Sequence, residues 1–270
     1  MTRSCFRRAA LIAGALTLGL AAPAFAQDEI DDLDDGARTR VGLGPNFYPS
    51  FPGSEDFDIG PLIEFESAKG GEPFDFGAPD DSMGFSLIDA GGVRIGPVVN
   101  WEGTRTAADV GANLPKVKFS IEPGAFAAVE LGESFRLRAE ARKGVTGHKG
   151  WIATAGADFI ARNGDDWLFS IGPRVTWSNN RYHDAWFGVS PAAAFASGLP
   201  TYNPGGGIHA YGATASFLTQ LGPRWGIYTY AKYDRLVGDA ADSPIVTQLG
   251  SRDQFSGGLA LTYVFDGALF

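Results

Sequence analysis

The sequence predicts an all-β protein, a transmembrane antiparallel β-barrel of about 12 strands, with about 10 strands as the alternative. Two observations carry this prediction. From residue 40 onward, large apolar residues return at odd positions in segments about as long as a tilted membrane strand. In the closing segment, large apolar residues stand at the odd positions 255, 259, 261, 263 and 265, while the even positions 256, 258, 260 and 262 are small or polar, which is typical of a wall with lipid outside and a polar lumen inside.

Residues 1–26 have the organisation of a cleaved secretory signal peptide. Arg3, Arg7 and Arg8 precede a short apolar run, and residues 24–26 (AFA) supply the small residues of a cleavage site. No later stretch approaches the ~18 consecutive apolar residues of a membrane helix. A membrane protein with this sequence must therefore cross the bilayer with strands.

Removal of the signal changes the composition of the chain. Three arginines leave and no acidic residue does, so the formal net charge goes from -9 to -12, which argues against a nucleic-acid partner. Cys5, the only cysteine, leaves as well, so the mature chain has no disulfide and no thiol nucleophile. Residues 27–39 form an acidic lead without the ligand spacing of a calcium loop, and we predict no metal and no cofactor.

Residues 40–270 are assigned to the barrel. The alternating segments are residues 41–47, 59–65, 85–87, 93–101, 117–121, 135–137, 151–159, 167–177, 211–217, 225–233 and 255–265. Short connections at residues 90–92, 132–134, 163–166 and 222–224 alternate with long ones at 102–115, 179–208 and 236–253. This alternation is typical of outer-membrane barrels, in which the short turns face the periplasm.

Strand parity predicts one further strand. Bacterial barrels have an even number of strands with both chain ends in the periplasm, and an odd count of segments does not satisfy this rule. The best place for the additional strand is residues 73–77 (PFDFG), where two phenylalanines alternate. The loops 179–208 and 236–253 contain apolar residues that would be costly to leave in water, so we predict that both loops are ordered and fold over the mouth. These residues are Trp186, Phe187, Val189, Phe195, Leu199, Ile245 and Val246.

Aromatic residues lie at the strand ends on the outward face. They read as membrane-interface girdle residues, although a sugar-binding platform is the alternative. They are Trp101, Trp151, Trp167, Trp177, Trp225 and Phe265.

Charged residues occupy the inward, even-numbered face of the predicted strands, and with nine basic and seven acidic residues among them the two signs nearly balance. The predicted lumen-lining residues are Arg94, Arg136, Arg138, Arg142, Arg174, Glu122, Glu140 and Asp158. Such a set either forms bridges that fill the interior or makes a constriction that selects solutes. If the interior is filled, Arg136, Arg138 and Arg142 should pair with acids such as Glu122 and Glu140.

Catalysis finds little support in the sequence, and we predict that the protein is not an enzyme. The three histidines are His148, His183 and His209, and neither a G-x-S-x-G turn nor an H-E-x-x-H motif is present. The tightest catalytic candidate is His183 beside Asp184, with Ser178 or Ser190 as the nucleophile of a lipase-like site.

Four segments resemble the MltA-interacting protein / OmpV (MipA/OmpV) family of Gram-negative outer-membrane proteins. They are residues 48–54 (YPSFPGS), 186–204 (WFGVSPAAAFASGLPTYNP), 236–246 (LVGDAADSPIV) and 257–265 (GGLALTYVF). The tail, residues 266–270, departs from the family pattern, in which the chain ends at the aromatic residue corresponding to Phe265. Either Phe265 or Phe270 is then the assembly signal that the barrel-assembly machinery reads.

The resemblance implies a location in the Gram-negative outer membrane, in contact with its lipid. It also implies a scaffold for murein (peptidoglycan) enzymes, with a lytic transglycosylase and a bifunctional penicillin-binding protein as partners. No catalytic residues accompany that role. A solute pore is the alternative function, and an adhesin or a lipid hydrolase is a lesser one.

Overall fold

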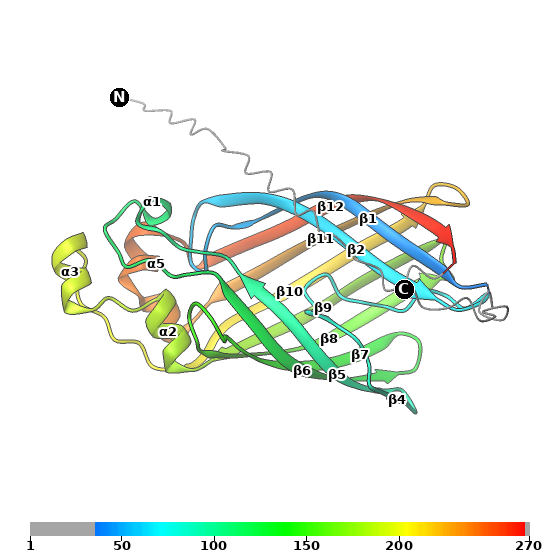
Figure 1. The fold of residues 1–270 in the computed structure, drawn as a ribbon, viewed down its shortest axis with the longest axis horizontal. Helices are drawn as coiled ribbons and strands as arrows, with labels where there is room; N and C mark the ends of the chain where they lie inside the picture. The colour runs from blue at the N-terminus through cyan, green and yellow to red at the C-terminus, as the bar shows by residue number, and fades with distance from the viewer. Residues whose placement is uncertain (1–35, 268–270) are drawn as a thin grey trace, which may run out of the picture. The chain divides into compact units, whose positions relative to one another are not determined.

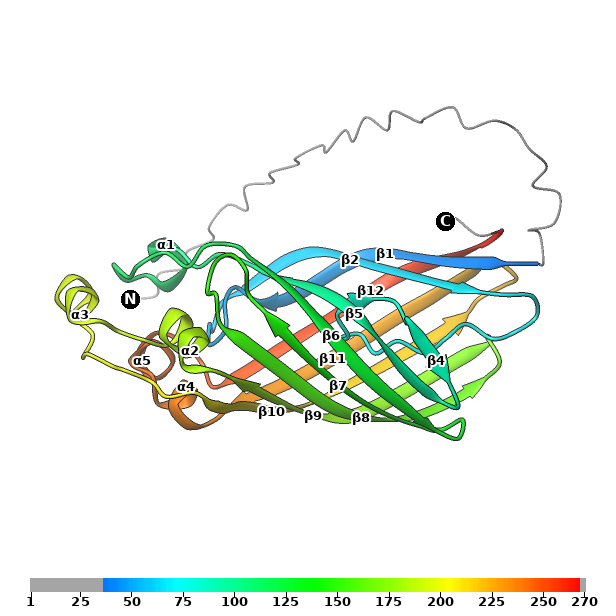
Figure 2. The same cartoon turned by 60° about the horizontal axis from the view of Figure 1, so that its bottom comes forward.

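A computed structural model describes residues 36–267. The predicted signal peptide, most of the acidic lead and Phe270 lie outside the described residues. The described part forms one curled sheet of twelve strands, with five short helices gathered at one end (Figures 1 and 2). This confirms the predicted fold class. No helix within residues 36–267 is long and apolar enough to cross a membrane.

The strands are β1 (Arg38–Pro49), β2 (Phe57–Ala68), β3 (Met83–Gly84), β4 (Ile88–Ala90), β5 (Val93–Glu102), β6 (Ser120–Leu131), β7 (Phe135–Lys143), β8 (Trp151–Asn163), β9 (Trp167–Ser178), β10 (Gly207–Gln220), β11 (Trp225–Leu236) and β12 (Asp253–Asp266). The helices are α1 (Ala107–Val110), α2 (Asn180–Trp186), α3 (Pro191–Ser197), α4 (Gly238–Asp242) and α5 (Pro244–Leu249).

Each strand from β5 to β12 pairs antiparallel with the next, and β1 joins β12 to β2. Short turns connect the strands at one end of the barrel, the short-turn end. Gly91 and Gly92, for example, join β4 to β5 with φ of 61° and 77°, a left-handed conformation that suits a two-residue hairpin. The helices lie in the longer connections at the opposite, long-loop end. The predicted alternation of short and long connections is therefore confirmed.

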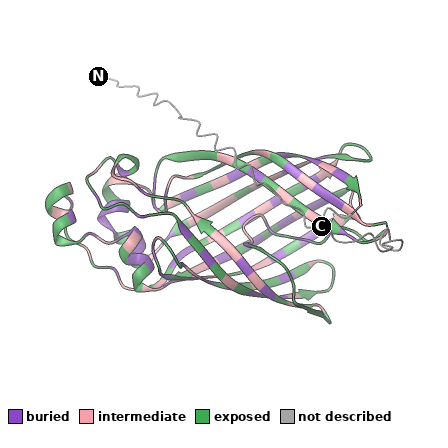
Figure 3. Ribbon diagram, viewed as in Figure 1, coloured by how far each residue is buried: buried purple, intermediate pink, exposed green. Residues whose placement is uncertain are grey.

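Apolar side chains face outward along the strands, as the odd-numbered pattern predicts. In β12, Leu259 and Leu261 are 53% and 52% exposed, whereas Ala260 and Thr262 between them are 1% exposed. Figure 3 shows the same alternation of buried and exposed residues along neighbouring strands. A soluble protein would bury its leucines, so this surface fits contact with lipid.

The strand predicted at residues 73–77 is wrong. These residues pair with no strand, and two short strands, β3 and β4, share one edge of β5 instead. Residues 69–82, which we call the inner segment, run through the barrel interior, where Phe74 is 1% exposed. The alternation of phenylalanines is real, but Pro73 and Pro79 cannot donate to a sheet ladder and the interior offers the phenylalanines burial.

The long-loop end is closed by a cap, which we define as residues 103–119, 179–206 and 237–252. Its helices and loops share an apolar core in which Trp186, Phe187 and Ile245 are fully buried. The predicted ordering of these loops is thus confirmed for all the named apolar residues except one. Phe195 is 95% exposed, because it lies two residues after Ala193, the buried residue of α3, and so points the opposite way.

The predicted girdle residues divide between the two ends of the barrel. Three lie at the long-loop end, namely Trp101, Trp151 and Trp177, and three lie at the short-turn end, namely Trp167, Trp225 and Phe265. All six side chains are exposed. This placement suits two membrane interfaces better than a single sugar-binding platform.

Candidate functional site: the filled barrel interior

The barrel interior is crossed by a chain of ion pairs between neighbouring strands. Arg136 on β7 and Arg174 on β9 approach the two oxygens of Asp158 on β8, at 2.9 and 2.7 Å. Asp158 is 2% exposed, and both arginines are buried. Each sits on an inward-facing position, so the pleat of the three strands brings the side chains together. Three of the predicted lumen residues therefore form one cluster.

A second cluster lies nearer the long-loop end. Arg142 pairs with Glu140 and, at 3.0 Å, with Glu122, while Arg138 lies 2.9 Å from Glu140. Arg138 and Arg142 thus have the kind of partners that the sequence suggested. Arg136 pairs with Asp158 on the neighbouring strand β8, which is also a predicted lumen residue, and with Asp81 of the inner segment, which the sequence did not suggest.

Arg94 lies apart from both clusters, toward the short-turn end of β5. It pairs with Glu130 at 2.5 Å and with Asp75 of the inner segment at 3.2 Å. Both partners are solvent-exposed to a large extent. Arg94 therefore belongs to the rim of the barrel rather than to its buried middle.

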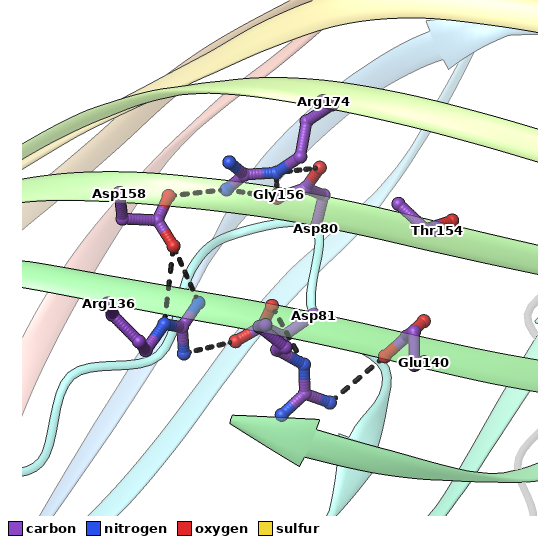
Figure 4. Close-up of a pocket in the computed structure, with 9 residues that line it drawn as sticks. Asp80, Asp81, Arg136, Glu140, Thr154, Gly156, Asp158 and Arg174 are labelled. Atoms are coloured by element: carbon purple, nitrogen blue, oxygen red, sulfur yellow. Dashed lines mark hydrogen bonds and ion pairs between the residues drawn. The ribbon is translucent and has the colours of Figure 1, made fainter. Parts of the chain in front are cut away.

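The inner segment supplies two acids that sequence reasoning left out of the interior. Asp80 lies 3.0 Å from Arg174 and 3.2 Å from Lys232 of β11, and it accepts a hydrogen bond from Thr214 of β10 at 3.1 Å. Asp81 lies 2.7 Å from Arg136 and 3.3 Å from Arg138. Figure 4 shows the two aspartates reaching from the inner segment toward the arginines of the wall. These contacts connect the segment to strands on the far side of the barrel.

Neighbouring residues of the inner segment strengthen the same attachment. Ser82 donates a hydrogen bond to Glu140 at 2.7 Å and accepts one from Arg142 at 2.8 Å. Nearer the short-turn end, the guanidinium of Arg40 lies 4.4 Å from the centre of the Phe74 ring, and that of Arg136 lies 4.6 Å from the Phe76 ring. The segment is therefore held by ion pairs, hydrogen bonds and cation–π contacts.

Two small cavities remain among these side chains. The first is lined by Asp80, Asp81 and three wall arginines, and the second by apolar and charged residues around Phe76 and Tyr228. Each has a volume of about 20 Å³, which is room for about one water molecule. The inner segment and the buried ion pairs therefore occupy much of the middle of the barrel.

The catalytic candidate at His183 does not assemble. Ser178 bonds His209 at 2.8 Å, not His183, and Ser190 caps α3 by accepting from the amide of Ala193. Ser178 is fully buried, and neither ring nitrogen of His183 has a hydrogen-bond partner within residues 36–267. Burial lowers the pKa of His183. The group that would act as base is therefore separated from its nucleophile.

Glu102, Glu122 and His148 bring three ligand-type atoms within 4.8 Å of one another. His148 Nδ1 accepts the amide of Gly150 at 2.9 Å, so Nε2 carries the proton and donates it to Glu122 at 2.8 Å. A metal ion would need the lone pair of Nε2. The geometry therefore fits a proton shared between the side chains better than a cation.

The family of the chain follows from comparison with known proteins. The family model described as MltA-interacting protein MipA matches residues 41–265. The chain belongs to the MipA family. This confirms the resemblance seen in the sequence. A curated relative, the MltA-interacting protein of Escherichia coli (strain K12), is 33% identical over 75 residues, which are 28% of this chain and 30% of the relative. The MltA-interacting protein of Shigella flexneri matches to the same extent.

Solved structures that overlap this MipA-family chain are outer-membrane proteins. An outer-membrane channel from Pseudomonas putida F1 gives a TM-score of 0.41 at 12% identity, covering 89% of this chain and 100% of the channel. The outer-membrane protein OmpT of Vibrio cholerae gives 0.36 at 9% identity, covering 88% of this chain and 100% of that protein. The family assignment rests on the family match and not on these overlaps.

Family membership and the apolar outer surface together place this protein in the Gram-negative outer membrane. The short-turn end then faces the periplasm, and the cap faces outward. In this orientation the cap lies at the outer end of the MipA-family barrel, and the inner segment runs through its interior.

Proposed function

We propose that this protein is a non-enzymatic interaction scaffold of the outer membrane that binds a murein lytic transglycosylase of the MltA type. The observation that carries the proposal is the filled interior. A conducting pore needs a continuous water path, whereas here the inner segment crosses the middle of the barrel and buried ion pairs join Asp80 and Asp158 to the wall arginine Arg174. A barrel that does not conduct would act by binding partners at its exposed surfaces.

The names of the curated relatives support the choice of partner, since both are called MltA-interacting protein. A partner in the periplasm reaches the short-turn end, where Arg224 pairs with Asp266 and Arg94 with Glu130. The acidic lead, which the sequence predicts on the same side, lies mostly outside the described residues. The penicillin-binding protein and the barrel-assembly machinery stay predictions from the resemblance alone.

The absence of enzyme activity is the second part of the proposal. Supporting it, Ser178 is fully buried beneath the cap and its histidine partner, His209, is 5% exposed. A nucleophile without access to substrate cannot turn over. Phospholipase and deacylase assays on the purified barrel test this, and hydrolysis that disappears in a Ser178→Ala variant would contradict it.

The scaffold role is tested with two measurements on the same preparation. The purified barrel in planar bilayers should pass no steady current, and it should retain a purified MltA-type transglycosylase when immobilised. An unrelated outer-membrane barrel at equal density is the control for retention. A steady conductance whose ion preference follows Arg138→Glu would replace the scaffold by a pore, and failure to retain the enzyme would remove the proposed partner.

A further inference from the structure

Four of the six lysines of this chain lie in one sector at the long-loop end of the barrel. We call them the lysine patch, and they are Lys116, Lys118, Lys143 and Lys149. The first two lie just before β6, the third ends β7, and the fourth lies in the loop that leads to β8. Lys143 is half-buried and the other three are exposed. A chain with a formal net charge of -9 thus concentrates positive charge on one part of its surface.

Contacts between the two loops bring the lysines together. The hydroxyl of Thr146 donates to the carbonyl of Phe119 at 3.0 Å, so the loop after β7 lies against the residue that follows Lys118. The amine of Lys143 donates to the carbonyl of Lys149 at 2.7 Å, which joins the end of β7 to the same loop. The lysines therefore form one surface, although they come from two separate connections.

No acid neutralises this surface. The only lysine with an ion pair in the part of the chain that the structure describes is Lys232, in the barrel interior. The sequence of the two loops, residues 103–119 and 144–150, contains a single acid, Asp109. Its carboxylate accepts hydrogen bonds from the amide and the hydroxyl of Thr106, so it is already engaged in its own loop.

Other exposed cations at the long-loop end do have partners. Arg235 pairs with Asp253 at 2.5 Å, and Arg252 pairs with Asp242 at 2.9 Å. These two arginines lie near β11 and β12, away from the loops around β6 to β8. The lysine patch is therefore distinguished by its unpaired charge and not by exposure alone.

The patch lies where the outer surface changes from apolar to polar. Lys143 faces Trp151 in the β7–β8 pairing, and its amine lies 5.4 Å from the centre of the tryptophan ring. Trp151, Phe119 and Val145 are exposed apolar residues of the same sector. Tryptophan prefers the membrane interface, and a lysine beside it extends its amine toward the head groups. Because the long-loop end faces outward, these head groups belong to the outer leaflet.

The outer leaflet of a Gram-negative outer membrane is built from a glycolipid, an acylated disaccharide that carries phosphate groups. Lysine amines bind phosphates as point charges. The exposed apolar residues beside the lysines suit the acyl chains of the same molecule. A free phosphate ion would use the amines alone, whereas the glycolipid matches both parts of this surface.

We propose that the lysine patch binds the phosphate groups of this glycolipid and holds a molecule of it against β6, β7 and β8. The inference goes beyond the scaffold role, because a periplasmic partner reaches the short-turn end and the glycolipid reaches the opposite end. The barrel thus has a lipid site in the outer leaflet that is independent of its periplasmic contacts.

Native mass spectrometry of the purified, delipidated barrel measures the bound glycolipid. The probe is bisphosphorylated lipid A, and its dephosphorylated form with the same acyl chains is the comparison. Wild type should bind the phosphorylated form at least about tenfold more tightly, because the unpaired amines attract the phosphates. Equal binding of the two forms would overturn the proposal, since acyl contacts alone would then hold the lipid.

Two double variants with the same change in charge locate the site. Lys118→Gln/Lys149→Gln should weaken the binding of phosphorylated lipid A at least about tenfold and should leave the binding of the dephosphorylated form unchanged. Arg235→Gln/Arg252→Gln is the matched control, because it removes exposed cations at the same end that already have acidic partners. It should bind like wild type.

An equal loss of lipid A binding in the two double variants would also contradict the proposal, because net charge and not the lysine patch would then govern binding. The band of the folded barrel in detergent gels reports whether each variant folds, and Lys149→Gln alone replaces the double variant if that one does not. Neither measurement involves a transglycosylase, so failure to retain that enzyme would leave this result unaffected.

Discussion

The cap and the middle of the barrel are held together by different interactions. In the cap, Trp186, Phe187 and Ile245 are fully buried in one apolar core. In the middle, Arg136 and Asp158 are equally buried but are held by ion pairs. The cap is therefore stabilised by apolar packing, and the middle of the barrel by ion pairs between buried charges.

The difference has consequences for how each region responds to change. Apolar packing is non-directional and is weakened mainly by cavities. A buried ion pair adds little to stability compared with an apolar pair of the same shape, yet removal of one partner is costly because the other charge is left without compensation. The cap should therefore be sensitive to side-chain volume, and the middle to side-chain charge.

The largest effect is expected from Trp186→Ala, which removes the largest fully buried side chain of the cap. The cap should lose about 3–5 kcal/mol of stability. Hydrogen exchange of residues 179–206 measures this, while the strands should keep their protection. Phe195→Ala is the matched control: this residue is 95% exposed, so its removal should change stability by less than about 0.5 kcal/mol. Equal effects of the two substitutions would contradict the distinction between them.

A smaller loss, about 3 kcal/mol, is expected from Arg136→Gln in the middle of the barrel. The substitution leaves Asp158 with Arg174 alone and Asp81 with Arg138 alone. The temperature at which the band of the folded barrel is replaced by that of the unfolded chain in detergent gels should fall. Added salt should not reproduce this loss of stability, because the pairs are buried. Arg224→Gln, which breaks an exposed pair with Asp266 at the short-turn end, should leave this temperature unchanged. A similar fall for both variants would show that burial does not matter here.

The wall of this barrel is predictable from sequence because lipid imposes a strict period. Leu259 and Leu261 face outward at odd positions, and the same alternation of outward apolar residues recurs along the other strands. The inner segment was predicted as a strand because the same period does not tell the two sides of the wall apart. Phe74 and Phe76 also alternate, but a side chain buried in the lumen and one facing lipid leave the same period-2 pattern in the sequence. The pattern identifies the alternation and not the layer in which the chain lies.

The interior pairs were predictable in kind but not in detail. Inward parity is enough to bring Arg138 near Glu140, because both lie on one strand two residues apart. Parity says nothing of Asp80 and Asp81, which come from a segment outside the sheet. Two adjacent aspartates after a proline were the available signal, since each can pair with an arginine of the lumen. The exposure of Phe195 was not predictable, because α3 is too short for the sequence to show which of its faces is buried.

The smallest effect, a pH dependence confined to the cap, comes from His183. This side chain is 1% exposed, and burial lowers its pKa, while the carboxylates of Asp239 and Asp184 act in the opposite direction. Its neighbours Tyr182 and His209 lie with ring centres 6.5 and 5.6 Å away. Because the folded cap disfavours the charged ring, the opened cap binds more protons below the ordinary histidine pKa of about 6.5.

The cap should therefore be most stable above that pH and should open more often as the pH falls from 7 to 5. Hydrogen exchange of residues 179–206, corrected for the intrinsic effect of pH, should show a severalfold increase in opening that is smaller in His183→Leu. The barrel strands serve as the internal reference, since their protection should not change over the same range. If wild type and His183→Leu respond alike to pH, the proton is taken up elsewhere in the cap. The pH dependence would then not come from His183.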